Sequence, residues 1–121
     1  MPPCPYCDVS PDDAWAITEH AVAVPPGAPL TAGHVIVAPR RHVAFFYDLD
    51  VQEQRAVWDL VGVVRKRITE SLKVGTVHIG FADAELEEDG HACVHVVPNV
   101  PGEHLELPGG IEWVVDDPRA G

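Results

Sequence analysis

Apolar residues recur every three or four positions in one long segment of the chain. Asp50 stands before this segment and Glu53 follows three positions later, a pairing typical of the capping box at a helix N-terminus. The apolar residues that would share one helical face are Val57, Leu60, Val61, Val64, Ile68 and Leu72. The spacing predicts a helix over Val51–Leu72.

Short runs that alternate or are rich in valine make up much of the remaining chain and predict β-strands. They are Trp15–Thr18, Ala21–Val24, His34–Ala38, Val74–Phe81, His91–Val97 and Ile111–Val115. The runs do not alternate with helices as in a parallel βαβ array, so a mainly antiparallel sheet covered by one helix is expected. Since no internal repeat or long linker divides the sequence, residues 1–121 are expected to form a single α+β domain.

Composition and charge narrow the classes of partner. Hydrophobic residues make up 46% of the 121 residues, and no apolar run approaches the roughly 20 residues of a membrane span. Eight Lys and Arg against 19 Asp and Glu leave a net charge of −11, which repels nucleic-acid phosphates and anionic lipids. We therefore expect neither nucleic-acid nor membrane partners. No basic and apolar segment typical of a secretory signal is visible at the start, so a cytoplasmic protein is expected.

Two cysteines near the start of the chain are separated by two residues, in Cys4-Pro5-Tyr6-Cys7. Such a pair can bind a metal ion with two further ligands, or it can form a redox-active disulfide. The string resembles a glutaredoxin active site, but only three residues precede Cys4, too few for the strand that this redox motif follows. A third interpretation is a pair of unligated cysteines at a frayed terminus.

Reactive and apolar side chains alternate in the segment His91–Pro98. Because strand side chains have a period of two, His91, Cys93 and His95 are expected to project from one face. Imidazole and thiol groups are costly to bury without hydrogen-bond partners or a metal, so the row indicates a functional site. An accidental row on an exposed face is the alternative.

Several segments resemble the histidine triad (HIT) family, whose hallmark is His-x-His-x-His followed by apolar residues and often Pro. Gly33–Val43 looks like the upstream strand and turn of the family, and Ile79–Asp83 looks like the strand end before the triad. Gly109–Val114 resembles a C-terminal segment of one bacterial branch. The resemblance implies an α+β HIT-like fold with a five-stranded, mainly antiparallel sheet, one long helix and short N-terminal elements. It also implies a homodimer, and nucleotide hydrolysis or nucleotidyl transfer as the usual activity.

A structural zinc site is a further implication of this resemblance. Zinc-bearing members carry an N-terminal C-x-x-C and two histidines, and the matching positions here are Cys4, Cys7, His42 and His91. Two thiolates and two imidazoles close a tetrahedral shell and leave no position for water, as in structural zinc sites.

The middle position of the triad is Cys93, where active family members have a nucleophilic histidine. Thiolates attack phosphorus and acyl carbon, and an imidazolium at His95 would stabilise the Cys93 thiolate, so His95 is expected to be its proton partner. His34 matches an additional family histidine that would lie near His95 and orient it, although a histidine satisfied by solvent is the alternative. Asp83 and Asn99, close to the triad strand, are the candidate substrate-binding residues.

Two departures from the family pattern affect the expected substrate. Glu85–Gly90 contains four carboxylates where the family has a phosphate-binding Gly-Gln-Ser/Thr segment, and Pro25–Pro29 stands where it has a ribose-binding Asp. Each carboxylate beside a polyphosphate would cost about 1 kcal/mol or more at an effective dielectric of about 20. An ordinary polyphosphate is therefore not the expected substrate.

Three functions are consistent with these observations. The favoured one is a HIT-like hydrolase or nucleotidyl transferase that acts through Cys93 on a nucleotide-like, phosphate-ester or acyl-ester small molecule. The second is a catalytically silent HIT scaffold that binds a small ligand or a protein partner through the same pocket. The third is redox or metal handling by Cys93 together with the N-terminal cysteines.

Overall fold

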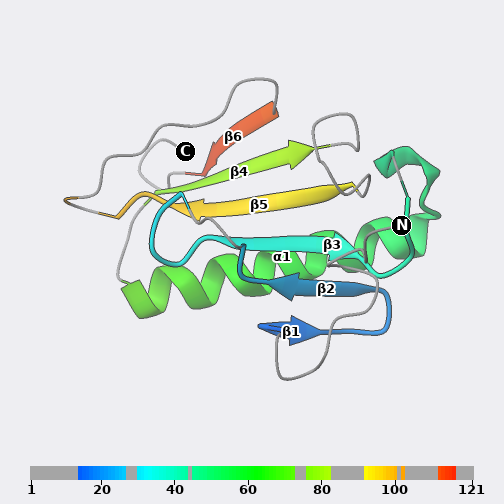
Figure 1. Cartoon of the computed structure of the whole chain (residues 1–121), viewed down its shortest axis with the longest axis horizontal. Helices are drawn as coiled ribbons and strands as arrows, with labels where there is room; N and C mark the ends of the chain where they lie inside the picture. Colours follow the sequence, from blue (N-terminus) through cyan, green and yellow to red (C-terminus); the bar gives the residue numbers. More distant parts are fainter. Residues whose placement is uncertain are drawn as a thin grey trace.

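The computed structural model describes residues 14–26, 30–43, 45–72, 76–82, 92–100, 102 and 112–116. In these residues, six antiparallel strands form one sheet, which packs against one long helix (Figure 1). The elements in chain order are β1 (Ala16–Ile17), β2 (Ala21–Val24), β3 (Val35–Pro39), the short 3-10 helix η1 (Phe46–Asp48), α1 (Val51–Leu72), β4 (Val77–Ala82), β5 (Cys93–Pro98) and β6 (Glu112–Asp116). The predicted α+β fold with a mainly antiparallel sheet and one long helix is confirmed.

The strands lie in the order β1-β2-β3-β5-β4-β6, and each neighbouring pair is antiparallel. Five described strands contain four to six residues each, in agreement with the five expected, and the two-residue β1 extends one edge. The central pair, β3 and β5, joins segments far apart in the sequence (Figure 1). In this pair, Ile36 lies opposite His95. This pairing positions the candidate site.

The helix begins and ends as predicted, at Val51 and Leu72. Asp50 and Glu53 form the expected capping box: the Glu53 amide donates to Asp50 Oδ1 at 2.7 Å, and the Asp50 amide donates to Glu53 Oε1 at 3.2 Å. The apolar residues of the predicted face are buried, with one exception. Leu72 is 39% exposed because, in the last turn, its side chain lies beside the Gly33 turn rather than in the core.

The strand boundaries differ from the predicted ones by small shifts. Trp15–Thr18 was expected where the structure has Ala16–Ile17, and His34–Ala38 where it has Val35–Pro39. Val74–Phe81 was expected where it has Val77–Ala82, His91–Val97 where it has Cys93–Pro98, and Ile111–Val115 where it has Glu112–Asp116. Residues 73–75, 91 and 111 lie outside the described part. The shifts arise because backbone pairing with a neighbouring strand, and not side-chain type, determines where a strand ends.

The main core lies between α1 and the sheet, where the helix packs on β2, β3 and β5. Alternate strand residues, such as Val37 and Val94, point into this core, where they are fully buried. A second, smaller cluster contains Val22, Val24, Ile36, Ala38 and Cys93. Among the described residues, α1 is the one long helix, and it contains too few apolar residues to cross a membrane.

Candidate active site

The face of the sheet turned away from α1 carries the thiol of Cys93. Val94 and Val96 of β5 belong to the core beneath the helix, whereas Cys93 packs in the second cluster. His95, two residues further along β5, shares the face of Cys93, as the alternating sequence predicts. His91, the third member of the predicted row, lies outside the described residues.

Three side chains form a connected group on this face. His34 Nε2 lies 3.0 Å from His95 Nδ1, and His95 Nε2 lies 3.6 Å from Cys93 Sγ. The two imidazole rings are tilted by 48° with their centroids 5.2 Å apart. The expected proximity of His34 to His95 is therefore present in the structure, and His95 links His34 to the thiol.

The turn before β3 holds His34 in position. The backbone N–H of Leu30 donates to His34 Nδ1 at 3.1 Å. Thr31 is buried in the same turn, and its hydroxyl donates to the carbonyl of Pro98 at the end of β5, at 2.8 Å. Leu30 and Thr31 could not be predicted as site residues, because a backbone amide carries no sequence signature and a threonine in a loop is unremarkable by type.

Burial differs among the three site residues. Cys93 is fully buried, His34 is 5% exposed and His95 is half-buried. Ala14, which precedes β1, packs against the cluster that contains Cys93. A thiol beside an imidazole has the composition of a nucleophilic site, but a substrate reaches this sulfur only after covering atoms move.

The candidate substrate-binding residues are only partly described. Asn99 is exposed directly after β5, and its backbone N–H donates to the carbonyl of Thr76 at 3.0 Å. Asp83 and the acidic segment Glu85–Gly90 lie outside the described residues. Asn99 is thus exposed on the surface, and the role of its side chain in substrate binding stays a prediction.

One of the four expected zinc ligands, His42, belongs to the described part of the chain. It is exposed in the turn that follows β3. Cys4, Cys7 and His91 lie outside the described residues, so the predicted ligand set stays a prediction. Within the ranges that are described, no three His, Cys, Asp or Glu side chains are grouped as metal ligands.

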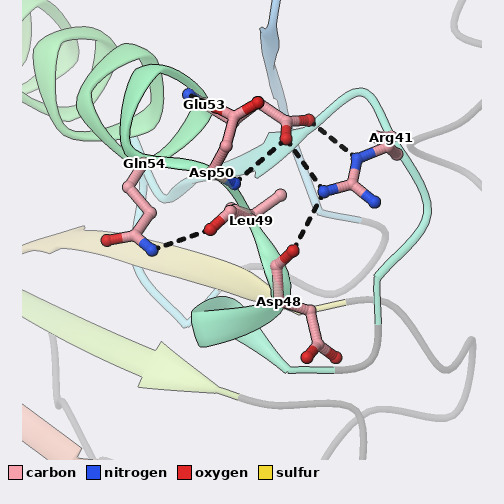
Figure 2. Close-up of polar contacts among 6 residues, drawn as sticks. All are labelled: Arg41, Asp48, Leu49, Asp50, Glu53 and Gln54. Carbon is pink, nitrogen blue, oxygen red and sulfur yellow. Dashed lines mark hydrogen bonds and ion pairs between the residues drawn. The ribbon is translucent and has the colours of Figure 1, made fainter.

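A charged pair fixes the turn that carries His42 to the start of α1 (Figure 2). Arg41 Nε and Nη2 donate to the two carboxylate oxygens of Glu53, both at 2.9 Å, and Nη2 also donates to the carbonyl of Asp48 at 3.0 Å. Hydrogen bonds from Arg41 lower the pKa of Glu53 to about 2, against the opposing effect of burial. Glu53 was predicted as part of a helix cap, whereas its partner Arg41 was not predicted. A carboxylate buried at that position could have indicated a cationic partner.

Curated proteins of similar sequence are HIT-like proteins. Two uncharacterized HIT-like proteins of Mycobacterium tuberculosis, from strains CDC 1551 and H37Rv, are each 28% identical to this chain over 118 residues. Each match covers 90% of this chain and 80% of the relative. Comparison with models of protein families gives no match.

Solved structures of similar fold include several histidine triad proteins. The C. elegans NitFhit protein superimposes with a TM-score of 0.72 at 23% identity, over 79% of this chain but only 24% of that protein. Diadenosine triphosphate hydrolase of Plasmodium falciparum gives 0.73 at 15% identity, over 82% and 68% of the two chains. A zinc-bound histidine triad family protein of Mycobacterium smegmatis gives 0.68 at 22% identity, over 78% and 70%. The fold is thus the HIT fold, and the curated relatives support a HIT-like assignment.

Proposed function

We propose that this chain is a HIT-like hydrolase or nucleotidyl transferase in which Cys93 is the nucleophile. The observation that carries the proposal is the connected group of His34, His95 and Cys93 on the face of the sheet away from α1. A thiol in contact with an imidazole that is itself held by a third group is a common arrangement at nucleophilic cysteine sites. The similarity in fold to a diadenosine triphosphate hydrolase supports a phosphoryl or nucleotidyl substrate class.

The proposed reaction has two steps. The Cys93 thiolate forms a bond to phosphorus or acyl carbon, and the bond from that atom to the leaving oxygen breaks with its electron pair. The leaving oxygen takes a proton from water. A second water then forms a bond to the same atom, and the bond from that atom to sulfur breaks with its electron pair, which restores the Cys93 thiolate. This water releases its proton to solvent. In a transferase, an acceptor hydroxyl would replace that water.

The substrate class follows from the residues that differ from the family pattern. The carboxylates of Glu85–Gly90 oppose a polyphosphate, and Pro25–Pro29 replaces the ribose-binding segment. We therefore propose a nucleotide-like compound with few phosphates, or a phosphate or acyl ester. Asn99 and Asp83 are the proposed substrate contacts.

Intact-mass measurement of the full chain after incubation with nucleotides and with acyl esters tests this function. We expect a covalent adduct that peptide mapping places on Cys93. A Cys93→Ser variant should form no adduct, because a hydroxyl is a far weaker nucleophile than a thiolate. Turnover that persists in Cys93→Ser would show that another group performs the chemistry.

A second candidate function is supported by the complete burial of Cys93. In it, the chain is a catalytically silent HIT scaffold that binds a small ligand or a protein through the same face. Reversible binding of a nucleotide, detected by calorimetry and unchanged in Cys93→Ser, would favour this scaffold over the enzyme. A Cys93→His variant is informative in both cases, since gained nucleotide hydrolysis would mean that the family nucleophile alone had been lost.

We also propose a structural zinc held by Cys4, Cys7, His42 and His91. The donor chemistry fits zinc, and one similar structure is a zinc-bound protein. When bound, the metal would stabilise the fold and supply no water for the reaction, since four protein ligands fill its shell. Metal analysis of protein purified without added zinc should find about one equivalent per chain, which a Cys4→Ser, Cys7→Ser double variant should lose.

The proposed setting of this activity is a cytoplasmic homodimer with a small-molecule substrate. Sedimentation velocity at micromolar concentration tests the dimer directly, and a single species at the monomer mass would contradict it.

A further inference from the structure

A chain of four groups leads from the backbone of Leu30 through His34 and His95 to Cys93. We propose that the Leu30 amide fixes the direction of these hydrogen bonds, so that His95 donates its Nε2 proton to the Cys93 sulfur and does not accept one from it. The inference deepens the proposed function and rests on it for the use of the site in a reaction.

The first step is the polarity of the Leu30 amide. A backbone N–H is a donor only, and it lies 3.1 Å from His34 Nδ1, which must therefore be the unprotonated acceptor. An imidazole with an unprotonated Nδ1 carries its single proton on Nε2. His34 is consequently neutral and presents Nε2–H towards β5.

The second step transfers this polarity to His95. His34 Nε2–H lies 3.0 Å from His95 Nδ1, so His95 Nδ1 accepts and the proton of His95 sits on Nε2. That nitrogen is the one 3.6 Å from Cys93 Sγ, within hydrogen-bond range for sulfur. In an imidazolium, Nδ1 of His95 would also carry a proton, which would face the proton on Nε2 of His34. The imidazolium expected from the sequence therefore does not fit this arrangement.

The consequence is a defined role for each group. His95 cannot take a proton from the thiol at a nitrogen that already holds one, so it is a hydrogen-bond donor to sulfur and not its general base. When sulfur has formed its bond to substrate, the same N–H can donate to a substrate oxygen near that position. The Leu30 amide and His34 are positioning groups that act through His95.

Long-range proton–nitrogen NMR on the full chain with ¹⁵N-labelled histidine measures these tautomers without any substrate. At about pH 8, we expect both His34 and His95 to show a protonated-type Nε2 and an unprotonated-type Nδ1. A protonated Nδ1 on His95, or equal populations of its two tautomers, would overturn the proposal.

Two variants of Leu30 separate its amide from its side chain. Leu30→Pro removes the N–H, and Leu30→Ala keeps it while shortening the side chain. We expect His95 to keep its tautomer in Leu30→Ala and to populate the Nδ1–H form in Leu30→Pro. If folded Leu30→Pro keeps the His95 tautomer unchanged, a group other than the Leu30 amide fixes the direction of these hydrogen bonds, which would overturn the proposal.

Variants of His34 give the same information if Leu30→Pro does not fold. His34→Leu removes the donor to His95 Nδ1, whereas the amide of His34→Gln can replace it. We expect the Nδ1–H form of His95 to appear in His34→Leu and to be suppressed in His34→Gln. Equal spectra for the two variants would overturn the role of His34. The outcome is distinguishable from that of the proposed function, since the tautomers can be as expected even if no Cys93 adduct forms, and the reverse also holds.

Discussion

Glu53 shows how one residue can satisfy two local demands. Its carboxylate accepts the Asp50 amide, which caps the helix, and it also accepts two N–H groups of Arg41 (Figure 2). The side chain is only about a tenth exposed, so a partner must compensate for the lost hydration of its charge. The Arg41 guanidinium provides this compensation, and its own pKa is raised above the usual value by the hydrogen bonds to Glu53.

The first prediction concerns the stability that Glu53 provides. Glu53→Gln keeps the size of the side chain but removes its charge, and we expect the free energy of unfolding at pH 7 to fall by about 1–3 kcal/mol. The folded pKa of about 2 lies below the ordinary value of 4.5, so this contribution is complete above pH 4.5 and is lost as the pH falls towards 2. Urea unfolding of both proteins between these pH values measures the difference. Glu70→Gln, at an exposed position of α1, is the control, and equal losses in the two variants would contradict the prediction.

Sequence reasoning about the site succeeded where residues are neighbours along a strand. Cys93 and His95 share a face because of the strand period, which is a local property. The contact of His34 with His95 joins residues 61 positions apart, and only the family resemblance indicated it. The amide of Leu30 could not be predicted, since every residue except proline has the same donor and only the folded turn decides where it points.

At the scale of elements, the turn before β3 connects the site to both layers of the fold. Gly33 has a φ of +89°, a conformation that residues with a Cβ rarely adopt. A Cβ built there would lie 2.7 Å from Leu72 Cδ1 of α1 and 3.2 Å from Pro98 Cγ of β5. The turn therefore needs glycine for both its backbone conformation and its packing.

A matched pair of glycine substitutions tests this requirement. We expect Gly33→Ala to lower the free energy of unfolding by about 1–3 kcal/mol, because of the positive φ and the close contact with Leu72. Gly62→Ala should instead raise it by about 0.5–1 kcal/mol, since Gly62 lies inside α1 with nothing within 4 Å of an added Cβ. Thermal unfolding of the two variants should thus shift in opposite directions, and a shift of the same sign would refute the argument.

The helix and the strands differ in how closely the sequence predicts their ends. The bounds of α1 were predicted correctly because a capping box marks its start and a continuous apolar face follows its length. No comparable side-chain signal marks the end of a strand. The short β1 is an example: Trp15 and Thr18 each donate a backbone hydrogen bond to β2, but the strand itself covers only Ala16 and Ile17.

At the scale of the whole molecule, the net charge of −11 acts on stability through repulsion among surface carboxylates. We expect the midpoint of thermal unfolding to rise by a few degrees when NaCl increases from about 0.02 to about 0.5 M, because salt screens this repulsion. Glu70→Lys changes the net charge from −11 to −9 and should reduce the effect of salt. A midpoint that falls with salt would mean that attractive pairs such as Arg41–Glu53 outweigh the repulsion.

The complete burial of Cys93 makes its thiol a reporter of how the molecule opens. A small alkylating reagent can reach this sulfur only in states in which the covering atoms have moved, so the labelling rate measures the population of those states. If the site serves catalysis, its opening must be local, and the rate at low urea should be nearly independent of urea concentration. At higher urea the rate should rise steeply as opening of the whole sheet takes over. The difference between the free energies of local opening and of unfolding of the whole sheet then measures how much more easily the site opens than the rest of the fold.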